Sequence, residues 1–148
     1  MILQEYLDDT YTKEQQLALT ELNCVDVNLT SLEGIENLVK LTSLVCNSNQ
    51  LTSLKGIEKL VELEMLVCCN NRITSLEGIE HLTKLEYLDF DNNEISSLIG
   101  IENLKHLTEI YCEDNPLPYK SERLEDVIKE IKIEKRKNAI GKLLTDGN

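Results

Sequence analysis

The chain has 148 residues, of which 41% are hydrophobic, 28% are charged and only 4% are aromatic. This length suits one folded domain with an aliphatic core, and we expect a single domain over residues 1–148. The formal net charge of −12 argues against nucleic acid and anionic membranes as partners, because both are bound through lysine and arginine, and it favours basic partners.

Residues 1–18 precede the repetitive part of the chain and are predicted to form a helical N-terminal cap. Apolar residues at helical spacing open this segment. Thr12 and Gln15 then match the S/T-x-x-E/Q pattern of a helix start.

Two features predict an intracellular, cytoplasmic protein. The first residues lack the positive start, apolar run and cleavage site of a secretory signal, and no apolar run approaches the ~18 residues that a membrane span needs. The chain has five cysteines, an odd number that favours free thiols in a reducing compartment.

From Leu19 to Leu117 the chain repeats every 22 residues without a gap. Each block begins with alternating apolar residues, which predict a short strand, and continues with T/S-S-L-x-G-I-E-x-L, where we expect helical turns. Side chains 22 positions apart should stack on one another. The sequence therefore predicts an α/β fold, a right-handed β-α superhelix over residues 19–118. It should carry a five-stranded parallel sheet on its concave face and helical caps at both ends.

Two inward columns follow from this register. An asparagine column comes just after each strand, where buried backbone groups need a partner that both donates and accepts, so we predict a structural ladder of Asn49, Asn71, Asn93 and Asn115. A second column should fill the core with small apolar side chains and contains Cys24, Cys46, Cys68 and Cys112.

Residues 119–148 are predicted to form a C-terminal helical cap. Pro116 and Pro118 interrupt the repeat, and Lys120 replaces the next column leucine. An amphipathic helix face should lie over the last coil and comprises Leu124, Val127, Ile128 and Ile131. The basic residues near Lys135 fit either a solvated helix end or a nuclear signal or nucleic-acid contact.

The pattern LxxLxCxxNxLTSLxGIExLxx resembles the 22-residue class of leucine-rich repeats. That class includes the bacterial internalins and the regulatory subunit of protein phosphatase 1 that carries such repeats. The cysteine slot, together with the ending from Asn115 to Tyr119, is similar to small repeat proteins of large DNA viruses, protists and bacteria. The resemblance covers about two-thirds of the chain and implies the fold rather than a partner.

The strand residues that point away from the core should line the concave face. They include an apolar and aromatic lane, ringed by acids toward the C-terminal coils, as is typical of interface cores. We predict partner-binding roles for Val45, Met65, Val67, Tyr87, Asp89, Asp91, Glu109, Tyr111 and Glu113.

No arrangement typical of catalysis is found in the sequence. His81 and His106 fall at different places in the repeat, and the glycines follow the repeat rather than a phosphate loop. A column of cysteines gives a line instead of a tetrahedral zinc site. Cys69 should face the solvent, either as an inert or as a reactive thiol, and Asp91 would raise its pKa. We expect no enzyme activity, no cofactor and no metal.

The sequence therefore predicts a protein-binding module, a monomer or weakly self-associating, whose concave face takes a basic, partly apolar protein or peptide. One alternative is a structural protein that assembles through exposed solenoid ends or sheet edges. The other is a regulatory subunit of a phosphatase, which rests on the resemblance alone.

Overall fold

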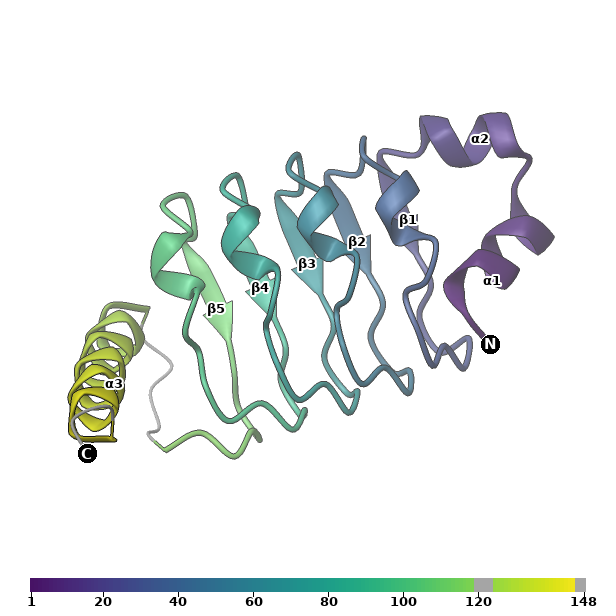
Figure 1. Cartoon of the computed structure of the whole chain (residues 1–148). Helices are drawn as coiled ribbons and strands as arrows, with labels where there is room; N and C mark the ends of the chain where they lie inside the picture. Colours follow the sequence, from purple (N-terminus) through teal and green to yellow (C-terminus); the bar gives the residue numbers. More distant parts are fainter. Residues whose placement is uncertain (119–123, 146–148) are drawn as a thin grey trace.

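The protein is a solenoid of stacked coils, seen in a computed structural model that describes residues 1–118 and 124–145. One layer is a five-stranded parallel sheet in the order β1-β2-β3-β4-β5, and short 3-10 helices form the opposite layer (Figure 1). The strands are β1 (Glu21–Asn23), β2 (Ser43–Val45), β3 (Met65–Val67), β4 (Tyr87–Asp89) and β5 (Glu109–Tyr111). The 3-10 helices are η1 (Ile35–Asn37), η2 (Ile57–Lys59), η3 (Ile79–His81) and η4 (Ile101–Asn103).

The strands pair in the register that the repeat predicts. Leu44 lies opposite Leu66, and Leu66 lies opposite Leu88, so residues 22 positions apart are neighbours. The side chains of all three are fully buried in one aliphatic core between the two layers. The predicted parallel sheet and solenoid are therefore confirmed.

Each return segment bends at a glycine with positive φ, between +95° and +113°. A Cβ atom at Gly56 would lie 2.8 Å from Cγ2 of Ile35 in the preceding coil, so the coils approach closely there. The hydrogen-bond partner of this glycine was not predicted from the sequence. Gly56 N donates to Oε2 of Glu58 at 3.0 Å. The same bond recurs in the other coils, with Glu36, Glu80 and Glu102 as acceptors.

Two helices cover the first coil, α1 (Leu3–Thr10) and α2 (Lys13–Ala18) (Figure 1). Thr12 caps α2 as predicted, because its side chain accepts from Gln15 N. The start of α1 takes the place of a preceding coil: Leu3 N donates to Ser31 O at 3.0 Å and Gln4 N to Glu33 O at 2.9 Å. The start of α1 therefore continues the stack of coils on the N-terminal side of the first repeat.

At the other end the helix α3 (Leu124–Thr145) packs against η4. Val127 and Ile131 are fully buried as predicted, whereas Ile128 is only half-buried. Lys135 Nζ forms an ion pair with Oε1 of Glu102 in η4. The predicted start of the cap at residues 119–123, including Lys120, lies outside the described residues, as do residues 146–148.

None of the helices in the described ranges has the length and apolar character that crossing a membrane requires.

Candidate functional site

The outward side chains of β2 to β5 carry the apolar and aromatic residues that the sequence placed on the concave face. We call this set the apolar lane, and it comprises Val45, Met65, Val67, Tyr87 and Tyr111. The side chains of Met65 and Tyr111 are 38% and 44% exposed, and the other three are half-buried. The lane is therefore accessible to a partner along four strands.

A pair of aromatic rings ends the lane on the last two strands. The ring centroids of Tyr87 and Tyr111 lie 5.5 Å apart, and the two ring planes are tilted by 38°. Tyr111 Oη lies 3.4 Å from Oε2 of Glu109 and donates a hydrogen bond to it. This ring pair was not predicted, because the two tyrosines occupy different outward columns.

The acids around the lane do not all lie on strands, which corrects one part of the sequence prediction. Asp89 and Glu109 are strand residues, but Asp91 and Glu113 come after β4 and β5 have ended. The chain turns after Asp91, because Asn92 adopts a left-handed conformation with φ of 53°. The same turn recurs in every coil.

These acids are held in place by backbone hydrogen bonds. Asp91 N donates to Oδ1 of Asp89 at 3.1 Å, and Glu113 N donates to Oδ1 of Asp91 at 2.6 Å. The carboxylates of neighbouring coils thus line up beside the tyrosines. They give this end of the concave face a negative charge at neutral pH.

This environment raises the pKa values of two nearby groups, the Tyr87 hydroxyl and the Cys69 thiol. Burial, followed by the Asp89 carboxylate, raises the pKa of the Tyr87 hydroxyl, and Tyr111 and Glu109 add to the shift. Burial and then Asp89 also raise the pKa of Cys69, which is half-buried rather than fully exposed. Since the thiolate is the reactive form, this shift makes the Cys69 thiol less reactive than an ordinary cysteine.

Under the concave face, the inner asparagines bond to the backbone of two consecutive coils. Asn71 Nδ2 donates to the carbonyl oxygens of Cys46 and Cys68 at 3.1 and 3.0 Å, and its Oδ1 accepts from Leu51 N at 3.0 Å. The same arrangement is found at Asn49, Asn93 and Asn115. The ladder therefore supports the turn that follows each strand.

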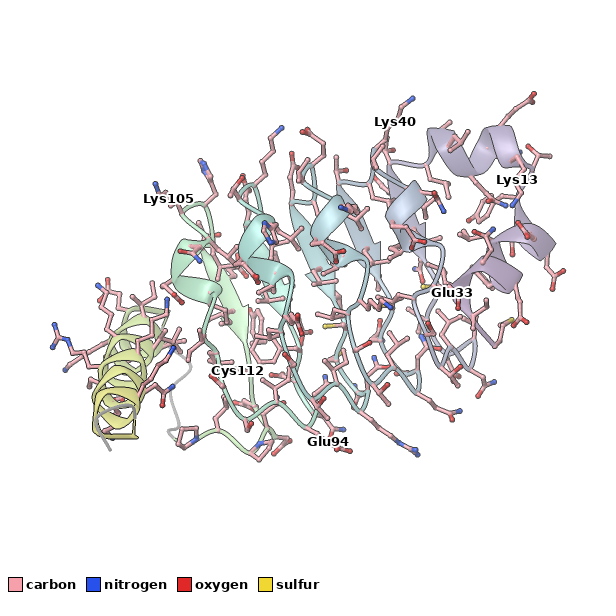
Figure 2. All side chains as sticks on the ribbon, in the orientation of Figure 1. Lys13, Glu33, Lys40, Glu94, Lys105 and Cys112 are labelled. Atoms are coloured by element: carbon pink, nitrogen blue, oxygen red, sulfur yellow. The ribbon has the colours of Figure 1, made fainter. Side chains whose placement is uncertain are left out.

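All five cysteines carry free thiols, and Cys24, Cys46, Cys68 and Cys112 are buried in the core (Cys112 is labelled in Figure 2). Burial raises the pKa of Cys24 to about 12. Burial also raises the pKa of Cys46, to which the neighbouring Cys68 and Cys24 contribute, so the three thiols lie along one column. In the described residues, no three His, Cys, Asp or Glu side chains converge in a way that could hold a metal ion.

Comparison with known proteins defines the class to which this architecture corresponds. A model of two leucine-rich repeats matches residues 61–102. No curated protein is significantly similar in sequence to the chain. The chain thus carries leucine-rich repeats and folds as a leucine-rich-repeat solenoid.

Solved structures that resemble the chain include internalin-like proteins. An internalin from Listeria monocytogenes is 27% identical over 74% of this chain and 34% of its own, with a TM-score of 0.67. The functional domain of InlJ from the same organism, described as including a cysteine ladder, is 36% identical over 73% of this chain and 23% of its own, with a TM-score of 0.68.

A leucine-rich-repeat protein from Leptospira interrogans is also similar, at 30% identity over 79% of this chain and 30% of its own, with a TM-score of 0.69. The chain therefore spans only about a quarter to a third of the length of these three proteins. The likeness supports the fold and the internalin-like repeat.

Proposed function

We propose that the protein is a non-catalytic protein-binding module that holds a basic, partly apolar segment of a partner against its apolar lane. The observation that carries this proposal is the pair of partly exposed rings, Tyr87 and Tyr111, beside carboxylates on the same strands. Aromatic side chains inside a charged rim are typical of interface cores. Leucine-rich-repeat proteins commonly act as protein-interaction modules, which supports the same function.

The size of the sheet limits what the concave face can hold. Five strands about 4.8 Å apart span roughly 19 Å. Each strand has three residues, two of them outward, and covers about 10 Å along its length. The resulting area, on the order of 200 Å², is well below the ~800 Å² that each partner contributes to a standard interface. We therefore propose a short peptide segment as the occupant of the lane, with a larger partner also touching the flanks.

A reducing compartment such as the cytoplasm is part of the proposal, because all five thiols are free and oxidising compartments favour disulfides. The two alternatives from the sequence, self-assembly and a phosphatase regulatory role, stay predictions.

Selection of random peptides displayed on phage, with the whole chain immobilised, tests the proposal. We expect enriched peptides to be basic and partly apolar, and to lose at least about 10-fold in affinity for the Tyr87→Ala, Tyr111→Ala double variant. The matched control is the double variant Val39→Ala, Val61→Ala, which truncates two exposed apolar side chains outside the lane. Peptides that bind both double variants equally well would show that the lane is not the site.

A further inference from the structure

Four outward positions on the last two strands form a square with two kinds of side chain. Tyr87 lies opposite Glu109 in the register of β4 and β5, and Asp89 lies opposite Tyr111. The tyrosines therefore occupy one diagonal of the square and the carboxylates occupy the other. We call these four residues the tyrosine–carboxylate square.

The other strand pairs do not repeat this arrangement. The square between β3 and β4 combines Met65 and Val67 with Tyr87 and Asp89, so it holds one aromatic ring and one carboxylate. The outward positions shared by β1 and β2, or by β2 and β3, contain no aromatic residue. The concave face thus has one place where two rings and two carboxylates meet.

Contacts join the groups of the square to one another and to the neighbouring backbone. The rings lean together across their diagonal to a centroid separation of 5.5 Å. Tyr111 Oη donates to Oε2 of Glu109, and the backbone N of Asp91 donates to Oδ1 of Asp89. Within the described residues the Glu109 side chain has no hydrogen-bond partner other than Tyr111. Its second oxygen can therefore accept from a ligand.

This combination of groups calls for a cation that is also planar. The face of a tyrosine ring attracts a cation, and the two carboxylates on the other diagonal add negative charge that no residue of the square balances. A guanidinium group stacks on an aromatic face through its plane and donates from its edges to carboxylates on either side. An ammonium group is a compact and strongly hydrated charge without the planar face that stacks on a ring, so it fits this combination less well.

We infer that the tyrosine–carboxylate square binds an arginine side chain of the partner segment. The inference rests on the proposed function, since the square lies in the apolar lane, and it adds the identity of the residue that anchors the segment. The apolar part of the segment then lies over Val67 and Val45, toward the N-terminal coils.

Nuclear magnetic resonance of the whole chain with N-acetyl-arginine amide tests the inference. The chain contains five tyrosines and one phenylalanine, so its ring signals are few and assignable. We expect the ring signals of Tyr87 and Tyr111 to shift and saturate, while those of Tyr6 do not move. N-acetyl-lysine amide should bind at least about 5-fold more weakly, and the neutral isostere N-acetyl-citrulline amide should cause no saturable shift.

The variant Asp89→Asn, Glu109→Gln keeps the shape of the square and removes its charge, so arginine-induced shifts should be lost. Glu21→Gln is the matched control, because Glu21 holds the column position of Glu109 on β1, far from the rings. Equal shifts with lysine or citrulline, shifts that survive in the double variant, or no saturable shift with any probe would each overturn the inference.

The proposed function fails on a separate result. If displayed peptides still require Tyr87 and Tyr111 while arginine amide does not bind, the lane remains a binding surface and only the arginine assignment falls. If displayed peptides bind without the two tyrosines, the proposed function falls whichever result the arginine probe gives.

Discussion

At the scale of single residues, the inner asparagines form hydrogen bonds with buried backbone groups, which no apolar residue could do. The Asn71 amide satisfies carbonyl oxygens of two coils and one backbone N–H, and the residue is only 9% exposed. A buried polar group that loses its partner costs about 1–3 kcal/mol. Each asparagine therefore stabilises two coils at once.

We expect Asn71→Leu to lower the free energy of unfolding by about 3 kcal/mol or more, because several backbone groups would be left unpaired. Urea denaturation monitored by circular dichroism measures this change. Asn103→Ala is the control, since Asn103 is exposed on η4 and its truncation should cost at most about 0.5 kcal/mol. Equal losses for the two variants would mean that the ladder contributes little to stability.

The inward columns could be predicted from the sequence, whereas contacts between columns could not. A period of 22 residues fixes which residues stack, so the burial of Leu66 and the inward position of Asn71 follow from spacing alone. Tyr87 and Tyr111 meet diagonally because their side chains lean across the strands. The repeat predicts which face a side chain occupies, but it does not determine the rotamer that the side chain adopts there. The hydrogen bond that Glu58 accepts from a backbone N–H was also not predicted. A glutamate in a repeat rich in charged residues is expected to face the solvent, and its sequence position does not indicate such a bond.

At the scale of elements, the two ends of the solenoid are protected differently. At the front, α1 forms backbone hydrogen bonds with the first coil and imitates the return segment of a further coil. At the back, α3 covers the last coil less completely, since Ile110 and Cys112 remain 5% and 8% exposed while their counterparts in the first coil, Leu22 and Cys24, are 1% and 0% exposed. The sequence predicted helices at both ends, but helical spacing alone does not reveal how a helix docks.

We expect Ile131→Ala to loosen α3, because Ile131 is fully buried and such truncations cost about 2–5 kcal/mol. In a solenoid each coil contacts only its neighbours, so the loss should be local. Hydrogen exchange should become faster for the β5 amides and stay unchanged for β2.

The exposed Lys132 on the same helix provides the matched control, and Lys132→Ala should leave the β5 amides protected. Uniform acceleration of exchange across all strands in Ile131→Ala would instead indicate that the chain unfolds as one cooperative unit.

At the scale of the whole molecule, the buried thiols make stability depend on pH over the length of the core. Burial raises the pKa of Cys24 from its ordinary 9.0 to about 12, and it raises the pKa values of Cys46 and Cys68 in the same direction. The folded chain therefore keeps these thiols protonated at a pH where the unfolded chain loses the protons. The contribution of these protonated thiols to the free energy of unfolding is fully present below pH ~9. It is lost as the pH rises toward the pKa values that the thiols have in the folded chain.

We expect the free energy of unfolding to be nearly constant from pH 7 to 8 and then to fall between about pH 9 and 12. Each of the three thiols should contribute a slope of about 1.4 kcal/mol per pH unit in that range. Urea denaturation at each pH, with reductant present, measures the curve.

The double variant Cys46→Val, Cys68→Val separates the thiols from other groups that titrate at high pH. Its side chains are close in size to cysteine, and Phe90 already occupies the same column in the fourth coil, so the core should accept them. Tyr6 and Tyr87, whose pKa values are also raised by burial, are unchanged in the variant and contribute equally to both curves. Because one of the three thiols, Cys24, would remain, the curve of the variant should lose about two-thirds of the slope that the thiols contribute. Parallel curves would mean that alkaline unfolding begins elsewhere in the molecule.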